Sequence, residues 1–229
     1  MREIKILGLN LRDYTVRETL HLVDQYLKSG VLNTIEYVSA QMIMSAEKDS
    51  RQKEWLESMD ILVYCDSDII RAANVTSRSR LKEIENNSFL KEFLKKLVRE
   101  RRTVYLLADT DEMLGILEAD MEKLPVPIAI AGKNVLQGEA PENSADIVIN
   151  DINDKAPDVL LVLSAYPDRE AFIHDNKNKI NAHIWLGLQK DSLLLEGEEK
   201  GLQGFVKGLR GRIFRRKVHL YKDYEKTER

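Results

Sequence analysis

The chain has 229 residues, 43% of them hydrophobic and 32% charged, with a formal net charge of −3 at pH 7. These values predict a soluble globular protein with a sizeable core and give no global argument for nucleic-acid binding. No apolar run approaches the roughly 20 residues that span a bilayer.

Several signals of targeting and metal binding are missing from the sequence. The opening MREIKILGLN alternates charged and apolar residues, which argues against a signal or transit peptide. Cys65 is the single cysteine, so we expect neither an intrachain disulfide nor a cysteine-based metal site. The four histidines show no metal-ligand spacing. The cytoplasm is the expected location.

Strand and helix patterns alternate along most of the chain. Apolar alternation or short apolar runs predict strands at residues 3–11, 33–39, 60–64, 103–109, 126–132, 158–165 and 182–188. Amphipathic spacing and caps, among them a capping-box pattern at Thr15 and Glu18, predict helices at residues 15–30, 40–59 with a break near Asp49, 88–102, 110–124 and 167–180. Residues 145–157 are ambiguous and favour a helix, whereas residues 74–87 and 132–145 read as irregular.

This alternation, with short connections, predicts a doubly wound, mostly parallel, Rossmann-like α/β sheet. We expect it to occupy residues 1–199 and to be followed by a basic C-terminal helical appendage at residues 200–229. In such sheets ligands bind beyond the carboxyl ends of the strands. No G-x-G-x-x-G, Walker A or G-x-S-x-G motif follows a predicted strand.

Asp66 and Asp68 follow the short buried strand at residues 60–64. One of them could be a helix N-cap, the commoner role at a strand-to-helix junction. Alternatively, Asp66 projects into the ligand crevice as a general base or a sugar-binding carboxylate. Cys65 beside it reads as a small buried residue, because no basic partner is in view.

Four segments together resemble the WecG/TagA/CpsF glycosyltransferases over roughly residues 3–221. These segments are ILGLNLRDYTVRETLHLV, AEKDSRQKEWLESMDILVYCDSDII, RRTVYLLADTDEMLGILEADMEKL and INDINDKAPDVLLVLSAYPDREAFI. The resemblance implies an inverting, metal-independent enzyme that needs no cofactor. It would move an N-acetylhexosamine-type sugar from a UDP donor to a polyprenyl-diphosphate-linked acceptor in teichoic acid, capsule or other cell-surface polysaccharide synthesis.

Carried over by position, the family's catalytic base falls on Asp66, which would deprotonate the acceptor hydroxyl. The resemblance also implies a set of residues that bind the substrates: Ser39, Gln41, Asp68, Arg169 and Lys190. A second set would meet the lipid diphosphate or the membrane: Arg210, Arg212, Arg215, Arg216 and Lys217.

The chain departs from the family pattern at several ligand positions. Ser39 stands where the family has asparagine, Glu83 where it has arginine, and Arg169 where it has glutamine. Gln189 and Lys190 replace two glycines after the last strand, where glycine would let the backbone approach a ligand. Arg169 and Lys190 could supply new diphosphate-binding cations, although a solvated surface charge is the alternative for each. A second hypothesis is therefore a catalytically inactive relative, acting as partner or regulator in a polysaccharide-assembly complex.

The segment from Lys207 to Lys222 is rich in Lys and Arg and contains no acid. A helical wheel places Phe205, Val206, Leu209, Ile213, Phe214, Leu220 and Tyr221 on one broad side. Such a helix predicts peripheral binding to the inner, anionic face of the cell membrane. The alternatives are a solvated helix or one that pairs with Glu196, Glu198 and Glu199. A homo-oligomer is compatible with the sequence.

Overall fold

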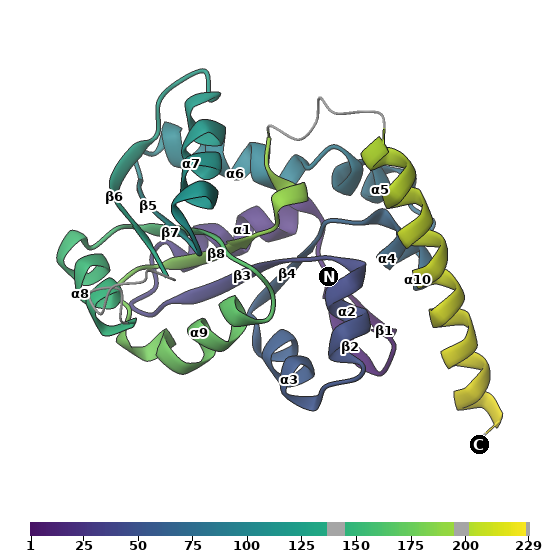
Figure 1. The fold of residues 1–229 in the computed structure, drawn as a ribbon. Coiled ribbons are helices and arrows are strands. Elements are labelled where there is room, and N and C mark those ends of the chain that lie inside the picture. Colours follow the sequence, from purple (N-terminus) through teal and green to yellow (C-terminus); the bar gives the residue numbers. More distant parts are fainter. Residues whose placement is uncertain (137–144, 195–201, 228–229) are drawn as a thin grey trace.

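The computed structural model describes residues 1–136, 145–194 and 202–227, with side chains outside 202–210 and 225–227. Its main feature is a six-stranded, all-parallel sheet in the order β4-β3-β8-β7-β5-β6 (Figure 1). The strands of this sheet are β3 (Asn33–Val38), β4 (Ile61–Tyr64), β5 (Thr103–Ala108), β6 (Ala129–Val135), β7 (Val159–Leu163) and β8 (Ile184–Leu188). The doubly wound α/β prediction is confirmed.

Helices cover both faces of this sheet (Figure 1). One face packs against α1 (Val16–Tyr26), α6 (Ser88–Arg99) and α7 (Asp111–Glu122). The other packs against α2 (Ala40–Ala46), α3 (Ser50–Ser58), α8 (Ala145–Lys155) and α9 (Asp168–Asn176). Strands β3, β4, β7 and β8 are short and almost wholly buried, as expected for parallel strands covered on both sides.

The N-terminal segment corrects the predicted single strand at residues 3–11. It is an antiparallel hairpin of β1 (Arg2–Ile6) and β2 (Leu9–Asp13), separate from the main sheet. The two residues of its loop, Leu7 and Gly8, have φ values of 49° and 76°, as a tight hairpin turn requires. No Asn-Gly or Asp-Gly pair marks this turn in the sequence.

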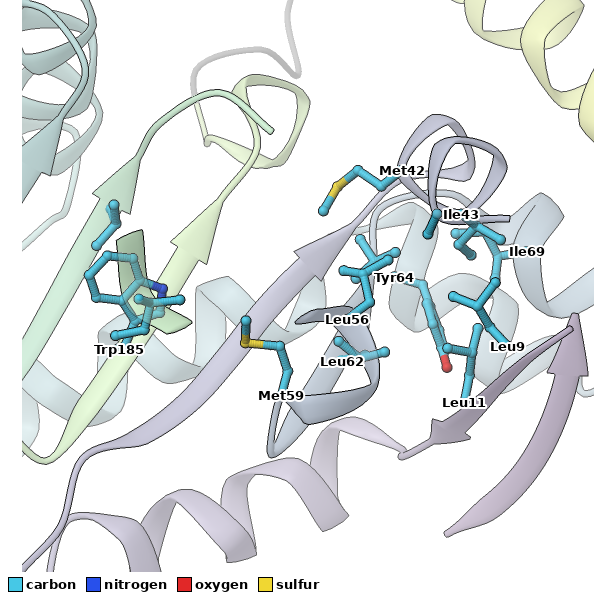
Figure 2. Packing of buried hydrophobic residues seen from close by; sticks show 14 of the residues in the cluster. Leu9, Leu11, Met42, Ile43, Leu56, Met59, Leu62, Tyr64, Ile69 and Trp185 are labelled. Carbon is cyan, nitrogen blue, oxygen red and sulfur yellow. The ribbon is translucent and has the colours of Figure 1, made fainter. Parts of the chain in front are cut away.

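The hairpin covers one edge of the main sheet. Leu9 and Leu11 point toward Tyr64 and Ile69 (Figure 2), and the Tyr64 hydroxyl donates to the backbone oxygen of Arg12 at 2.9 Å. Strand β4 is therefore buried although it is an outer strand of the sheet.

Two further boundaries differ from the sequence prediction. Strand β6 extends to Val135 because it pairs with β5 as far as Ala108. It begins only at Ala129, so Pro125 and Pro127 precede it. Residues expected to be irregular include α5 (Arg78–Glu85), which Ser77 caps. Elsewhere the Thr15–Glu18 capping box, the break at Asp49 and the helix over residues 145–155 are confirmed.

At the amino edge of the sheet, two aspartates hold neighbouring strands together. Asp60, before β4, accepts hydrogen bonds from the Thr34 backbone N–H at 2.7 Å and from the Thr34 hydroxyl at 2.8 Å. Lys177 contacts the same carboxylate at 2.9 Å. Asp158, before β7, binds Thr103 in the same way and pairs with Arg102. We refer to these arrangements as the Asp60 clamp and the Asp158 clamp.

The C-terminal helix α10 (Leu202–Thr227) lies along α2 and the short helix α4 (Ser67–Ala72) (Figure 1). Phe214 and Val218 are buried in this contact. Polar contacts border it: Lys217 with Glu47 at 2.6 Å, and the Lys222 ammonium with the Ala72 carbonyl at 2.8 Å. The helix is thus packed on the α/β layers along part of its length.

Candidate functional site

A cavity of about 250 Å³ lies beyond the carboxyl ends of β4, β3 and β8. The segment after β3 contributes Ser39, Ala40, Gln41 and Met44; the segment after β4 contributes Cys65 and Asp66; the segment after β8 contributes Gln189, Lys190 and Asp191; and α10 contributes Gly211 and Ile213. The walls of the cavity are therefore formed by the segments after three strands and by the C-terminal helix.

The chain topology explains why a cavity forms at this place. After β3 the chain passes to α2, which packs in one core layer, while after β8 it reaches Leu193, which packs in the opposite layer. Adjacent strands whose connections leave in opposite directions open a crevice at their carboxyl ends. Strands β3 and β8 are such neighbours.

Asp66 combines features of both roles considered from the sequence. It occupies the N-cap position of α4, but its side chain makes no capping hydrogen bond to that helix. Its carboxylate instead accepts from the Ala40 backbone N–H, at the start of α2, at 3.1 Å. It also lines the cavity. The carboxylate therefore links the segments that follow β4 and β3, and it faces the cavity.

Three other residues that the resemblance marked as substrate-binding line the same cavity: Ser39, Gln41 and Lys190. The Ser39 hydroxyl caps α2 by accepting from the Met42 N–H at 3.3 Å. Lys190 begins a short 3-10 turn, η3 (Lys190–Ser192). That turn is held because Gln189 N–H donates to the Ser192 hydroxyl at 3.0 Å and Ser192 N–H donates to the Gln189 carbonyl at 2.8 Å.

The sequence analysis placed Gln189 where the family has glycine. In the structure, the Gln189 side chain makes two contacts with the β3 side of the cavity. Its amide nitrogen donates to the Tyr37 carbonyl at 3.2 Å and lies 3.0 Å from the Met42 sulfur. The glutamine therefore bridges the β8 and β3 sides of the cavity. It also removes the close backbone approach that glycine would allow.

Asp68 lies beside the cavity, outside its lining. Its carboxylate pairs with Arg215 of α10 at 3.3 Å. It also lies so close to Gly211 that a Cβ on that residue would sit 1.8 Å from the Asp68 Oδ2. Asp68 thus helps to seat α10, and Gly211 is required for that close contact.

Arg169 is a correction to the sequence analysis. Both interpretations, a diphosphate ligand and a solvated charge, need an accessible guanidinium, but this side chain has 0% exposure. It is paired with Glu36 and Glu170 inside the protein. We therefore do not include Arg169 among the residues that contact a ligand.

Glu83, which the sequence analysis placed where the family has arginine, also has a structural role. It accepts from the Val16 N–H at 3.2 Å and from Arg80 at 3.2 Å. Arg80 is itself nearly buried and donates to Asp13 at 2.8 Å. These contacts join α5 to the chain around the start of α1.

The basic residues of α10 separate onto different faces. Arg212 and Arg216 are exposed, Arg215 pairs with Asp68, and Lys217 pairs with Glu47. The Arg210 side chain and the residues Glu196, Glu198 and Glu199 lie outside the described residues.

The apolar residues of α10 do not share the single side that the helical wheel predicted. Phe214 faces the protein, whereas Ile213 and Leu220 are 53% and 61% exposed. The side chains of Phe205, Val206 and Leu209 lie outside the described part of the helix. The prediction of one shared face is therefore wrong for the residues that can be placed.

The cavity also contains groups that the sequence analysis did not single out as ligands. Asp191 follows β8, so its position after a strand was a usable signal. Gly211 and Ile213 reach the cavity from α10, and no local pattern connects them with the strand ends. A second hollow of about 160 Å³, lined in part by Asp109 and Ser164, lies further along the same edge.

Two searches of the described residues were negative. Within the ranges described, no group of three or more His, Cys, Asp or Glu side chains is arranged to hold a metal ion. Among the helices in those ranges, none is both long and apolar enough to cross a membrane.

Comparison with known proteins identifies the family. A family profile described as "Glycosyl transferase WecG/TagA/CpsF family" matches residues 4–190. No curated protein matches the sequence significantly. The family match covers most of the chain, contains every cavity residue except those from α10 and Asp191, and confirms the resemblance.

Proposed function

The chain belongs to the WecG/TagA/CpsF family of glycosyltransferases of cell-surface polysaccharide synthesis, and we propose that it transfers an N-acetylhexosamine-type sugar. The proposed donor is a UDP-sugar and the proposed acceptor a saccharide on a polyprenyl diphosphate. The observation that carries the proposal is Asp66, a carboxylate oriented by a backbone N–H and open to a cavity at the sheet's carboxyl edge.

In this proposal Asp66 is the general base, and the transfer reaction needs no metal ion. Its carboxylate takes the proton from an acceptor hydroxyl, whose oxygen forms a bond to the anomeric carbon of the donor. The bond between that carbon and the diphosphate oxygen breaks on the opposite face, so UDP leaves with the electron pair and the configuration inverts. One positioned carboxylate is sufficient for this proton transfer.

The other cavity residues have proposed roles that follow from their chemistry. Lys190 supplies a positive charge for the diphosphate. Gln41 and Ser39 offer hydrogen-bonding groups to sugar hydroxyls from the β3 side of the cavity. Met44 and Ile213 form an apolar part of the wall, which suits the less polar face of a sugar ring.

We also propose that α10 rests on the inner, anionic surface of the cell membrane. Its outward side presents Leu220 and Tyr224, each more than half exposed, beside the exposed Arg212 and Arg216. Cations near an anionic leaflet contribute on the order of 1 kcal/mol each, and the apolar side chains can insert among the headgroups. This placement would bring the cavity near a lipid-linked acceptor.

The membrane proposal is tested by flotation with anionic liposomes. Leu220→Gln with Arg216→Gln should reduce flotation, because both side chains are exposed and neither supports the fold. Lys91→Gln with Lys95→Gln, on the exposed side of α6, is the control for lost charge elsewhere. Equal flotation of wild type and the α10 variant would contradict the proposal.

The enzymatic proposal is tested by UDP-sugar binding, measured by calorimetry, and by product formation. Wild type and Asp66→Asn should bind the donor with similar affinity, because the base acts on the acceptor, while only wild type should turn over. Lack of binding of any UDP-sugar at millimolar concentration would contradict the donor. Turnover by Asp66→Asn would contradict the base.

A non-catalytic relative remains the second candidate, and Gln189 favours it. Its side chain bridges two walls of the cavity where the family has glycine. This candidate predicts no donor binding by wild type and partial recovery of binding in Gln189→Gly, because the substitution removes the side chain that bridges the walls. Donor binding by wild type would exclude it.

A further inference from the structure

Arg169, Glu36 and Glu170 form a cluster of three ionisable side chains with no exposed surface. The Arg169 Nη2 donates to Glu36 and, at 2.9 Å, to Glu170. Its Nη1 donates to the backbone carbonyls of Ser164, at 2.9 Å, and Leu188. One guanidinium therefore contacts two carboxyl groups and two main-chain oxygens.

The four partners come from different parts of the fold. Glu36 is on β3, Ser164 directly follows β7, Leu188 ends β8, and Glu170 is on α9. Pairing between β7 and β8 ends at Leu163 and Leu188. The guanidinium thus satisfies carbonyl groups at the point where the two strands separate, and buried carbonyl groups require such donors.

On β8 these contacts lie one residue from the cavity lining, and on β3 they lie one residue from the carbonyl that binds Gln189. Leu188 immediately precedes Gln189, which lines the cavity from the β8 side. Glu36 immediately precedes Tyr37, whose carbonyl accepts the Gln189 side-chain hydrogen bond. Displacement of the guanidinium would therefore be transmitted to Gln189 and Lys190 through a single peptide unit on β8, and to Ser39 through β3.

Neighbouring residues leave the cluster little freedom to shift. A Cβ at Gly187 would lie 2.0 Å from the Glu36 Oε2, so the carboxyl group occupies the space that a side chain would fill. Ser164, on the opposite side, donates its hydroxyl to Asp109, and the Ala165 N–H donates to the same carboxylate at 2.6 Å. A continuous polar chain therefore extends from the end of β5 to β3.

Stability alone is a weak explanation for such a cluster. Burying charged groups is costly, and replacing them with well-packed apolar residues is often neutral or stabilising. Burial raises the pKa of the Glu36 carboxyl well above its usual range despite the opposing Arg169 charge, and the Glu170 charge raises it further. What an apolar replacement could not provide is a rigid fork of donors aimed at several elements.

We propose that Arg169 is a positioning residue that sets the spacing between the β3 and β8 walls of the cavity. It holds Gln189 and Lys190 at the distance from Ser39 and Gln41 at which both sides meet one ligand. The consequence for sugar transfer rests on the proposed function, whereas the structural consequence does not.

The test compares Arg169→Lys with Asp175→Asn in the full-length protein. Lysine keeps the positive charge but has no planar fork to reach both carbonyls and both carboxyl groups. Asp175→Asn is the control, because Asp175 is an exposed acid on the same helix, α9, and lies outside the buried cluster. Hydrogen exchange of the Gln189, Ser192 and Leu193 amides is measured, with Leu106 in β5 as the internal reference.

We expect Arg169→Lys to accelerate exchange at these three amides by about 10-fold or more relative to Leu106, the sign of local opening. Asp175→Asn should leave the ratio unchanged. In transfer assays, Arg169→Lys should lower kcat/KM by about 10- to 100-fold, because small displacements of positioned groups have effects of this size.

Glu36→Gln is the second variant in case Arg169→Lys fails to fold. It keeps an acceptor oxygen in the same place and should change the same exchange ratio in the same direction. An unchanged ratio in the folded variants would overturn the inference. Wild-type protein that transfers no sugar would overturn the proposed function only, since the exchange ratio still decides the role of Arg169.

Discussion

Strand β4 has an aspartate at each end, and the two differ in what surrounds them. Asp60, at the amino end, is held by both donors of Thr34 and by Lys177. Asp66, at the carboxyl end, accepts from the Ala40 N–H and faces a cavity. The same residue type thus joins strands at one edge of the sheet and is available to a ligand at the other.

Position at the carboxyl edge is not sufficient to make an acid available. Asp109 directly follows β5, but it is 4% exposed and accepts hydrogen bonds from Ser164 and Ala165. Asp66 differs because it is half-buried and lines the larger cavity, to which α10 contributes Gly211 and Ile213. Asp109 also borders the smaller hollow but is buried, so exposure, more than position at the edge, separates a candidate base from a structural acid.

The largest expected effect is that of Asp66→Asn on transfer. Loss of a general base should reduce kcat by about 10²- to 10⁴-fold. Asparagine keeps an oxygen for the Ala40 N–H, so the thermal midpoint should change little. Steady-state kinetics and thermal unfolding on the same preparation measure both quantities. A large loss of stability with unchanged kcat would make Asp66 a structural acid like Asp60.

Asp60→Ala should show the opposite pattern. It removes the acceptor for two Thr34 donors and one lysine, so the free energy of unfolding should fall by about 1–3 kcal/mol. The kcat of the folded fraction should remain close to wild type. Denaturant unfolding measures the first quantity and activity per folded molecule the second. A kcat loss beyond the unfolded fraction would contradict the separation of the two edges.

Substitutions of two lysines, one near each aspartate, test the same difference between the two ends of β4. Lys190→Ala should raise the KM for the UDP donor about 10-fold by removing one charge-assisted contact, with no change in unfolding. Lys177→Ala, its counterpart at the Asp60 clamp, should change stability by about 0–1 kcal/mol because the pair is partly exposed. It should leave the KM unchanged. Equal effects of both on the KM would point to a general charge effect.

The smallest expected effect concerns acid stability. Burial tends to raise the pKa of Asp60, but the Thr34 N–H and Lys177 outweigh it and lower that pKa. The pKa of Asp158 is lowered in the same way, because Thr103 and Arg102 outweigh burial. An acid with a lowered folded-state pKa stabilises the protein above its unfolded pKa of about 3.9, and this stabilisation is lost as pH falls through the folded value.

Asp60→Asn should therefore flatten the decline of unfolding free energy below about pH 4. Asp158→Asn should do the same, and the double variant should add the two changes because the clamps hold different strand pairs. Urea titrations between acid and neutral pH measure the slopes. Slopes equal to wild type would show that these carboxylates do not contribute through their charge.

Local patterns were informative where the structure depends on neighbours along the chain. The Thr15–Glu18 capping box, the break at Asp49 and the short apolar strand at residues 61–64 were all readable. The hairpin turn at Leu7 and Gly8 was not, because leucine at positive φ is unusual. Gly8 also lies against Tyr221, which is near the other end of the chain. A Cβ at Gly8 would be 2.8 Å from the Tyr221 hydroxyl.

The sequence by itself determined the order of the six strands of the main sheet, the family, and the position of Asp66 at the end of a buried strand. Only the tertiary structure decided that Arg169 is buried against Glu36, 133 residues away in the chain, and that α10 closes the cavity with Gly211 and Ile213. Periodicity and caps report interactions within a few residues. The environment of a charged side chain depends instead on which distant segments pack around it, and no local pattern contains that information.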